Sequence, residues 1–439
     1  MLQTFPHSAA VAEDGHLLVG GCDATELADR FGTPLIVFDR ATMEERAGVF
    51  AAELSPGSIF YAGKAFCCIA ICEILRDLGL GLDVCTGGEL ATALAAGFPP
   101  ERLLFHGNNK SVDELKAAKA AGVGRLVADS FDELERLESI GWTGKVLVRV
   151  TPGVVAHTHE HIQTGHEDSK FGFTLADGIA LSALRAAAAK GLDVAGIHAH
   201  IGSQIFEKDG FELAAARLAD LAAEARDRIG LEVRELDLGG GLGIAYTHDD
   251  DPPDPGTLVR DIARVARDAF TSRELPVPEV LFEPGRAVGG PAGVTVYRVG
   301  TVKRIPRARG GADQADRVYV AVDGGMSDNP RYPLYGARYE AWLANRMNDE
   351  ARLWCSVAGK HCESGDILIK DVLLPEDVSP GDLLCIPATG AYTYSMASNY
   401  NRVPRPAVVL VEEGSAREIV RRETHEDLLR LDVPMDGRE

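Results

Sequence analysis

Residues that can act as acids, bases or nucleophiles recur at the ends of short apolar runs in the first two thirds of this chain. A lysine amine can bond covalently to a carbonyl group, and histidine and carboxylate side chains can move protons or pair with cations. Glycine-rich turns can bind phosphate through bare backbone N–H groups. The residues concerned are Lys64, Asp83, His106, Asp129, His200, the glycines 239–241 and Glu283.

Eight apolar runs carry these residues, and most of the runs are followed by a helix-like segment. This alternation predicts an α/β fold, a (β/α)8 TIM barrel, whose active sites lie at the C-terminal ends of the strands. Because every reactive residue closes a run, we expect them to meet at that face. The runs begin at Ser58, Gly81, Arg102, Arg125, Val146, Val194, Glu235 and Val280.

Different patterns flank the barrel. Residues 17–40 predict a strand, a helix that begins at Asp23 and a second strand. From Gly293, short alternating strands separated by turns predict an antiparallel β-domain. The charge-dense tail from Glu412 predicts one solvated helix over the text REIVRRETHEDLLRL. The expected domains are an N-terminal segment packing with the β-domain (1–40), the barrel (41–286) and a C-terminal β-domain with a terminal helix (287–439).

Composition excludes several classes of protein. The 439 residues carry a formal net charge of −21, which argues against nucleic acid or an anionic membrane as partner. No stretch approaches the ~20 apolar residues of a membrane span. The N-terminus lacks a basic region followed by an apolar run, so we expect a cytoplasmic protein.

The eight cysteines are sparse, and most lie inside apolar segments, as reduced thiols do in cytosolic proteins. Three of them cluster at Cys67, Cys68 and Cys72. Adjacent cysteines on a helix diverge by about 100°, and the chain has no second C-x2-C pair. We therefore expect no metal there.

Two features leave alternatives open. Lys64 ends the run YAGK, where burial would lower the pKa of its amine toward that of a nucleophile, but many lysines at strand ends are simply solvated. The text GGGLG at 239–243 could bind phosphate or could be a tight β/α turn. It is not a dinucleotide fingerprint, because Ile244 stands where that motif requires glycine.

Taken together, the motifs resemble the fold-type III pyridoxal-phosphate decarboxylases, and among them the diaminopimelate decarboxylases. The similarity extends over nearly the whole chain, with motifs in the family's order. These are FGTPL (31–35), YAGKAF (61–66), GLDVCTGGEL (81–90), HTHEHIQTGHEDSKFGF (157–173), HIGSQ (200–204), LGGGLGI (238–244), EPGRA (283–287), DGGMSDNPRYPLYGARYE (323–340), CESGD (362–366) and GAY (390–392).

The resemblance implies pyridoxal 5'-phosphate as cofactor and Lys64 as the residue that binds it covalently. It also implies that His200 stacks on one face of the ring and that Glu283 pairs with the ring nitrogen, so that the ring can accept electrons when carbon dioxide leaves. The remaining cofactor-binding residues implied are Asp83, Ser203, Gly240, Gly241, Gly285, Arg286 and Tyr392.

The β-domain carries the residues that the resemblance assigns to the substrate. Arg331 and Tyr335 would grip a distal carboxylate with help from Arg286, and guanidinium geometry suits that group. Glu363 would bind the distal ammonium group, and Tyr392 also lies on the substrate side. Cys362 matches the residue that protonates the carbon from which carbon dioxide has left. In this family Cys362 and Glu363 reach into the partner's site, which implies a homodimer.

The activity implied is removal of carbon dioxide from the D-configured centre of meso-2,6-diaminopimelate to give L-lysine, the last step of lysine biosynthesis. One alternative is a related decarboxylase acting on another amino acid with a distal carboxylate or amide. A second is a non-catalytic carrier of pyridoxal phosphate, against which the β-domain and CESGD argue. An alanine racemase would need a tyrosine acid/base where this chain offers a cysteine motif.

Three residues depart from the usual family text. Phe66 replaces asparagine after YAxKA, Lys360 replaces proline before CESGD, and Tyr332 replaces the proline that commonly follows the arginine. The first two flank the chemistry without replacing a catalytic group, and Tyr332 stands next to the expected pocket for the distal carboxylate. The histidines at 157, 159, 161 and 166 suggest a metal site by their alternation. We expect none, because the family carries a similar loop without a metal.

Overall fold

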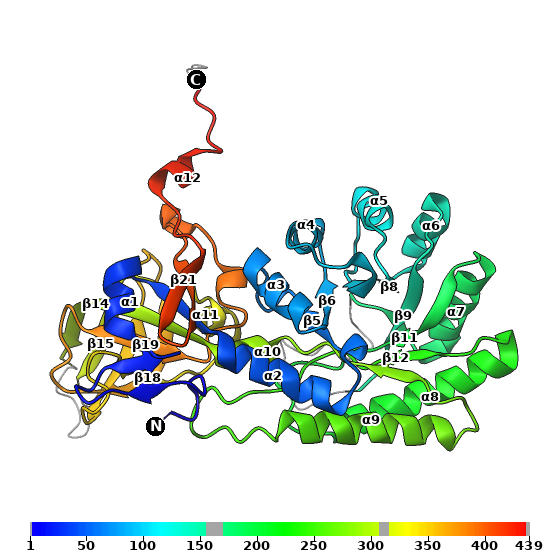
Figure 1. Cartoon of the computed structure of the whole chain (residues 1–439), viewed down its shortest axis with the longest axis horizontal. Helices are drawn as coiled ribbons and strands as arrows, with labels where there is room; N and C mark the ends of the chain where they lie inside the picture. Colours follow the sequence, from blue (N-terminus) through cyan, green and yellow to red (C-terminus); the bar gives the residue numbers. More distant parts are fainter. Residues whose placement is uncertain (1, 155–169, 307–315, 436–439) are drawn as a thin grey trace. The chain divides into compact units, whose positions relative to one another are not determined.

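The computed structural model describes residues 2–154, 170–306 and 316–435 (Figure 1). The chain forms two compact units. The barrel unit comprises Glu44–Ile244 and Asp251–Val288, and the β-unit comprises Met1–Met43, Ala245–Asp250 and Gly289–Glu439. The histidines at 157–166 lie outside the described residues. Every helix in the described part of the chain is too short or too polar to cross a bilayer.

Eight parallel strands form the barrel, in sequence order around it, which confirms the predicted fold. An isolated parallel bridge between Ile59 and Phe282 joins the first strand region to the last. A short ninth strand, β10 (Phe173–Thr174), pairs with β9 outside the ring. The barrel strands are β5 (Phe60–Ala62), β6 (Gly81–Val84), β7 (Leu103–Phe105), β8 (Arg125–Ala128), β9 (Lys145–Thr151), β11 (Asp193–His198), β12 (Glu235–Asp237) and β13 (Glu279–Leu281).

Helices cover the outside of these strands (Figure 1), and their ends carry capping residues. Ser111 and Glu114 form a capping box at the start of α5, and Gly122 ends that helix in the left-handed conformation. Thr86 and Ser130 cap α4 and α6 in the same way as Ser111. The helices are α2 (Arg40–Glu53), α3 (Ile69–Asp77), α4 (Gly87–Ala95), α5 (Val112–Ala121), α6 (Phe131–Ile140), α7 (Ile179–Ala189), α8 (Asp209–Ile229), α9 (Pro255–Thr271) and α10 (Arg286–Gly289).

Apolar side chains from six of the strands fill the inside of the barrel, so the barrel is a packed core rather than a pore. Alternate residues of a strand point to opposite faces, which lets one strand supply both this core and the helix-packed outer surface. The core residues are Phe60, Leu104, Val127, Leu147, Ala195 and Leu281.

The β-unit is built on one long strand, β14 (Gly293–Ile305), which pairs with β4 and β19 over its first half and with β15 over its second. The short strands expected after Gly293 are present. The expected antiparallel sheet is mixed, because β15 pairs with β17, and β20 with β4, in parallel. The strands are β1 (Ala10–Val11), β2 (Leu17–Val19), β3 (Cys22–Asp23), β4 (Leu35–Asp39), β14, β15 (Arg317–Val322), β16 (Trp342–Leu343), β17 (Leu353–Ala358), β18 (Ile367–Leu374), β19 (Leu383–Pro387), β20 (Ala407–Glu412) and β21 (Ser415–Val420).

The helices of the β-unit are short: α1 (Ala24–Phe31), α11 (Arg331–Tyr335) and α12 (His425–Leu429). As predicted, Asp23 caps α1. The prediction of one helix over the charged tail is wrong in its first half, because β21 pairs there with β20. Glu413 and Gly414 both have positive φ, which fits the tight turn of a two-residue hairpin. Within the helix predicted for this tail, only His425–Leu429 (α12) is helical.

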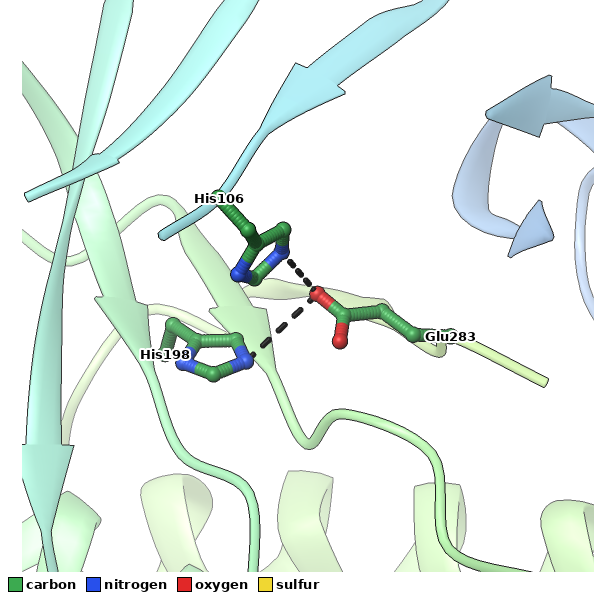
Figure 2. Close-up of side chains that lie close together, drawn as sticks. All are labelled: His106, His198 and Glu283. Carbon is green, nitrogen blue, oxygen red and sulfur yellow. Dashed lines mark ion pairs between the residues drawn. The ribbon is translucent and has the colours of Figure 1, made fainter. Parts of the chain in front are cut away.

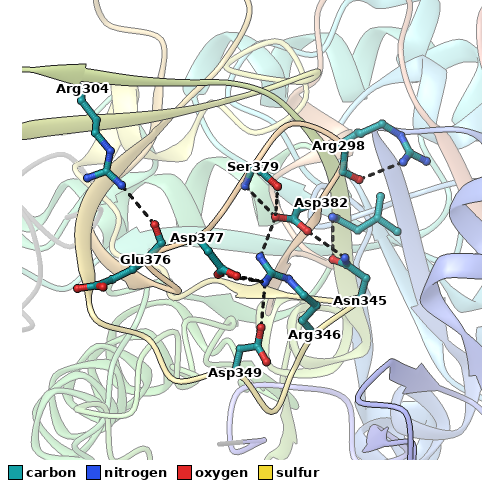
Figure 3. A network of polar contacts seen from close by, with 11 residues as sticks. Arg298, Arg304, Asn345, Arg346, Asp349, Glu376, Asp377, Ser379 and Asp382 are labelled. Atoms are coloured by element: carbon teal, nitrogen blue, oxygen red, sulfur yellow. Dashed lines mark hydrogen bonds and ion pairs between the residues drawn. The ribbon is translucent and has the colours of Figure 1, made fainter.

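A polar network anchors the start of β19 in this unit (Figure 3). Asp382 accepts hydrogen bonds from the guanidinium of Arg346 and from the backbone N–H of Ser379, each at 2.9 Å. Asn345 donates to Asp382 and accepts from the backbone N–H of Leu383. One aspartate therefore links the beginning of the strand to two loops.

Candidate active site

The residues that close the barrel strands lie close together at the C-terminal ends of those strands. Asp83 lies in β6, His106 follows β7 directly, His198 ends β11, and Glu283 lies two residues after β13. All four side chains are buried. Nε2 of His106 lies 3.9 Å from Oδ1 of Asp83, so the ends of neighbouring strands contribute to one site.

Two histidines converge on a single oxygen of Glu283 (Figure 2). Its Oε1 lies 2.5 Å from Nε2 of His106 and 3.4 Å from Nε2 of His198. The two imidazole rings meet edge to face at 70°, with centroids 4.9 Å apart. These are close approaches rather than aligned hydrogen bonds, because none of the three atoms has a hydrogen-bond partner among the described residues.

The cluster has one ionised group. Burial favours the neutral form of Glu283, but the interaction with His106 and His198 outweighs it and holds the pKa of Glu283 well below its usual range. Burial lowers the pKa of His106 to about 3 and also lowers the pKa of His198. At neutral pH a carboxylate therefore lies between two uncharged imidazoles.

Two neighbouring carboxyl groups behave in the opposite way. Burial, and then the charge of Glu283, raise the pKa values of Asp83 and Asp237 well above the usual range. Asp237 also accepts a 2.8 Å hydrogen bond from the backbone N–H of Gly239. Because like charges so close together cannot all be ionised, the negative charge of the site resides on Glu283.

Lys64 follows β5 by two residues, in the turn that begins after Ala62. Its side chain is exposed, so the expected burial of the amine is not found, because the residue lies beyond the end of the strand. Its positive charge nevertheless favours the ionised form of Asp83 and the neutral form of His200. The amine is therefore near both residues, on a residue that is exposed.

The glycine turn after β12 comes very near two other backbone segments. A Cβ atom on Gly240 would lie 2.1 Å from the carbonyl oxygen of Glu283, and one on Gly241 would lie 2.3 Å from that of Gly202. Gly241 also has a φ of 99°, which other residues rarely adopt. Only glycine fits this turn, because a side chain at either position would collide with a neighbouring backbone segment.

His200 rests on that turn. Its Nδ1 accepts a hydrogen bond of 3.2 Å from the backbone N–H of Gly240. Burial, and then the charge of Lys64, lower the pKa of His200 well below its usual value. The ring is therefore neutral and carries its proton on Nε2.

Ser203 and Arg286, both expected to bind the cofactor, are in contact. Nη2 of Arg286 donates a hydrogen bond of 2.9 Å to Oγ of Ser203. Beside Arg286, a Cβ atom on Gly285 would lie 2.9 Å from the side chain of Ala62 and 3.0 Å from that of Ala65. The EPGRA turn thus packs against the segment that carries Lys64.

In the β-unit, Arg331 begins α11 and is buried, with 6% of its surface exposed. Its guanidinium lies 4.2 Å from the ring centroid of Tyr246 and 5.3 Å from that of Tyr339. Nη1 donates a hydrogen bond of 2.6 Å to the hydroxyl of Tyr339. Despite its burial, Arg331 forms no ion pair with a carboxylate in the described ranges of the chain.

Two other predicted residues lie near Arg331. Tyr392 contributes to the electrostatic environment of its guanidinium. Tyr392 also has a φ of 59°, a conformation that tyrosine rarely adopts and that is often found at functional sites. Tyr335 lies four residues after Arg331 on α11, and this spacing places the two on the same helix face.

Cys362 and Glu363 lie on an exposed turn between β17 and β18. The backbone N–H of Cys362 donates a 3.1 Å hydrogen bond to Oδ1 of Asn401. Asp366 holds the turn in place, since its carboxylate accepts from the backbone N–H groups of Met326 (2.6 Å) and His361 (2.7 Å). The thiol and the Glu363 carboxylate thus project from an anchored loop.

Sequence reasoning missed four residues of these clusters, namely His198, Asp237, Tyr246 and Tyr339. His198 could have been found, because the alternation in His198-Ala199-His200 places both histidines on one side of an extended segment. Tyr246 and Tyr339 carried no comparable signal. Tyr246 lies in residues 245–250, which belong to the β-unit although barrel residues flank them on both sides.

Comparison with known proteins identifies the family. The model of the family described as "Pyridoxal-dependent decarboxylase, pyridoxal binding domain" matches residues 40–290. Diaminopimelate decarboxylase of Mycobacterium tuberculosis is 48% identical over 98% of this chain and 97% of its own length. The enzyme of the same name from Bacillus subtilis is 48% identical over 96% of both chains.

Solved structures agree with this assignment. The diaminopimelate decarboxylase of M. jannaschii, solved in complex with L-lysine, is 31% identical and covers 99% of both chains with a TM-score of 0.87. That of Helicobacter pylori, also with L-lysine, is 30% identical over 93% of this chain and 98% of its own, with a TM-score of 0.83. This chain therefore belongs to the pyridoxal-dependent decarboxylase family, in its diaminopimelate decarboxylase group.

Proposed function

We propose that this protein is a pyridoxal-phosphate-dependent carboxy-lyase that converts meso-2,6-diaminopimelate to L-lysine and carbon dioxide. The observation that carries the proposal is the buried, ionised Glu283 at the barrel end that also holds Lys64, His200 and the glycine turn. The names of the relatives, and L-lysine in two of the related structures, support the substrate and the product.

The barrel residues fit the cofactor chemically. Oε1 of Glu283 is buried without a hydrogen-bond partner among the described residues, so it can accept a hydrogen bond from a protonated ring nitrogen. Lys64 offers an exposed amine to the aldehyde. The glycine turn, Ser203, Gly285 and Arg286 offer N–H and O–H donors to the phosphate, and we include Asp83 and Tyr392 among the cofactor-binding residues.

When bound, pyridoxal phosphate supplies an electron-accepting ring that stabilises the negative charge left on carbon as carbon dioxide departs. Glu283 holds the proton on the ring nitrogen, which preserves this electron demand. The neutral ring of His200 would cover one face of the cofactor ring. The thiol of Cys362 would donate the proton that replaces the carboxylate, a task that requires its protonated form.

Arg331 supports the choice of substrate. A buried cation is stable only when charged or polar groups compensate for its lost hydration, and the groups around this guanidinium are the uncharged tyrosines Tyr246 and Tyr339. A distal carboxylate of the substrate supplies the missing anion, and Tyr335 and Arg286 assist. Glu363 binds the distal ammonium group. Diaminopimelate has both groups, whereas lysine and ornithine lack the distal carboxylate.

We further propose a cytoplasmic homodimer in which Cys362 and Glu363 complete the partner's site, and domains with boundaries at 1–40, 41–286 and 287–439. The exposure of Cys362 and Glu363 on an anchored turn supports active sites that are shared between subunits.

Mixing Lys64→Ala and Cys362→Ala subunits tests whether the two subunits share their active sites. Each mixed dimer then has one intact site, and random reassortment restores about a quarter of wild-type activity. If both residues come from one subunit, no activity returns.

The deciding experiment incubates the purified protein with pyridoxal phosphate and meso-diaminopimelate and measures carbon dioxide and L-lysine. Parallel reactions contain L-lysine or L-ornithine at the same concentration. We expect turnover of diaminopimelate alone. Preference for lysine or ornithine would leave a decarboxylase with another substrate, whereas cofactor binding without any release of carbon dioxide would contradict the proposed reaction.

A further inference from the structure

The proposed function leaves two buried imidazoles, those of His106 and His198, without a role. Their Nε2 atoms lie 2.5 and 3.4 Å from the same oxygen of Glu283 (Figure 2). They come from β7 and β11, which are not neighbours in the barrel, so the convergence is not a by-product of strand pairing.

We propose that His106 and His198 are positioning residues that keep Glu283 ionised and directed at the ring nitrogen of the cofactor, each as a neutral imidazole with its proton on Nε2. This inference rests on the proposed function, because it assigns Glu283 to that nitrogen. Neither histidine needs to touch the cofactor for this role, since each acts through Glu283.

The distances select the tautomer. A neutral imidazole has one N–H and one nitrogen with a lone pair, and a lone pair directed at a carboxylate is repelled by it. At 2.5 and 3.4 Å from Oε1, both Nε2 atoms must therefore carry the proton. Nδ1 of His198 is buried and has no hydrogen-bond partner in the described part of the chain, so no acceptor favours the other tautomer.

Burial favours neutral rings, although the charge of Glu283 favours protonation of both. Arg149, from β9, and Lys64 are the cations that disfavour protonation of His198, and Arg149 has the same effect on His106. Asp83 and Asp237, from β6 and β12, are held protonated and supply no competing negative charge. His200, which also lies near this cluster, is neutral and adds no charge.

Through Glu283, His106 and His198 affect the protonation of the cofactor's ring nitrogen. N–H groups beside a carboxylate stabilise its ionised form and make it a weaker base. If they are removed, Glu283 becomes a stronger base, and the proton shared with the ring nitrogen moves toward the carboxylate. The ring nitrogen then becomes less protonated, although Lys64 still binds the cofactor.

Nitrogen-15 NMR of the cofactor measures the protonation of its ring nitrogen directly. Holoenzyme is prepared with pyridoxal phosphate labelled with nitrogen-15 in the ring, and the chemical shift of the ring nitrogen is measured at neutral pH. We expect a protonated nitrogen in the wild type and a shift toward the unprotonated position in His106→Leu. His106→Gln, whose amide N–H can replace Nε2, should restore most of the wild-type shift. Leu104→Ala, a core change in the same strand, is the packing control.

An unchanged ring-nitrogen shift in His106→Leu, or the same change in Leu104→Ala, would overturn the inference. If substitution prevents folding, histidine labelling of the wild-type holoenzyme decides instead. Both rings should show the neutral tautomer protonated on Nε2, and a charged ring or a proton on Nδ1 would overturn the proposal. Wild-type protein that binds no pyridoxal phosphate would contradict the proposed function itself.

Discussion

The guanidinium of Arg331 donates a 2.6 Å hydrogen bond to the hydroxyl of Tyr339 and lies 4.2 Å from the ring centroid of Tyr246. The tyrosines fix the orientation of the cation and stabilise it through their rings, yet they contribute no negative charge. A guanidinium stays protonated at every pH at which the protein is folded. The arginine therefore remains charged and available to an anionic ligand.

Arg331→Ala tests the distal-carboxylate assignment. An unpaired charge in a desolvated site costs about 2 to 5 kcal/mol, so kcat/KM for diaminopimelate should fall on the order of 30-fold or more. Any activity on lysine should not fall in parallel, because lysine lacks that carboxylate. Arg338→Ala, at an exposed arginine that pairs with Asp249, is the matched control. Undiminished turnover of diaminopimelate would remove Arg331 from the site.

Tyr339→Phe keeps the aromatic ring and removes the hydroxyl that accepts from Arg331. A hydrogen bond to a charged group contributes about 1.5 to 3 kcal/mol, so we expect KM for diaminopimelate to rise about tenfold or more. The kcat value should change little, because the hydroxyl orients a binding group. Tyr319→Phe, on β15, should leave both constants unchanged. A loss confined to kcat would contradict the orienting role.

Lys64→Ala should abolish the visible absorption of the covalently bound cofactor. The other lysine that follows a barrel strand closely, Lys110, is buried and held by the carboxylate of Glu133 and two carbonyl groups, so it cannot substitute. Lys116→Ala, at an exposed position on α5, serves as control in the same titration with pyridoxal phosphate. Retention of the absorption band in Lys64→Ala would assign the covalent bond to another residue.

Cys362→Ala should bind the cofactor normally and form product slowly, since the thiol acts after carbon dioxide has left. Cofactor absorption and lysine formation are measured on the same preparation. Cys22→Ala, in the core of the same unit, controls for a general effect of losing a thiol. Equal turnover in wild type and Cys362→Ala would leave the cysteine without a chemical role.

The barrel was predictable because local signals agree there. Each strand is an apolar run that ends in a polar residue, and caps such as Ser111 and Thr86 mark the helices that follow. In the tail, local signals conflict. The charges of 417–431 favour a helix, but the positive-φ turn at Glu413 and Gly414 starts a hairpin, and pairing with β20 determines the outcome.

The site was only partly predictable for a related reason. Lys64, His200 and Glu283 lie in recognisable motifs, whereas the partners that set their environment come from distant segments. His106 and Glu283 meet because β7 and β13 end at the same face of the barrel. Tyr246 meets Arg331 because residues 245–250 belong to the β-unit, as Arg331 does. Such contacts depend on tertiary structure and leave no pattern in the local sequence.

Asp328 lies in the β-unit motif DGGMSDN and is buried. It accepts hydrogen bonds from the hydroxyl of Tyr297 (2.5 Å) and the backbone N–H of Gly325 (2.8 Å). Burial raises the pKa of Asp328 to about 7 despite these donors. The folded protein therefore retains a proton that the unfolded chain loses above about pH 4.

The direction in which the free energy of unfolding changes with pH follows from this difference in protonation. Because the folded pKa is the higher one, the contribution of Asp328 to stability is complete below about pH 4 and is lost as the pH rises to about 7. The free energy of unfolding of the wild type, relative to Asp328→Asn, should therefore fall by about 2 to 3 kcal/mol between pH 5 and pH 8. Urea unfolding at both pH values measures this difference. The same pH dependence in both proteins would show that Asp328 is ionised in the folded state throughout, since a permanently neutral amide has nothing to titrate.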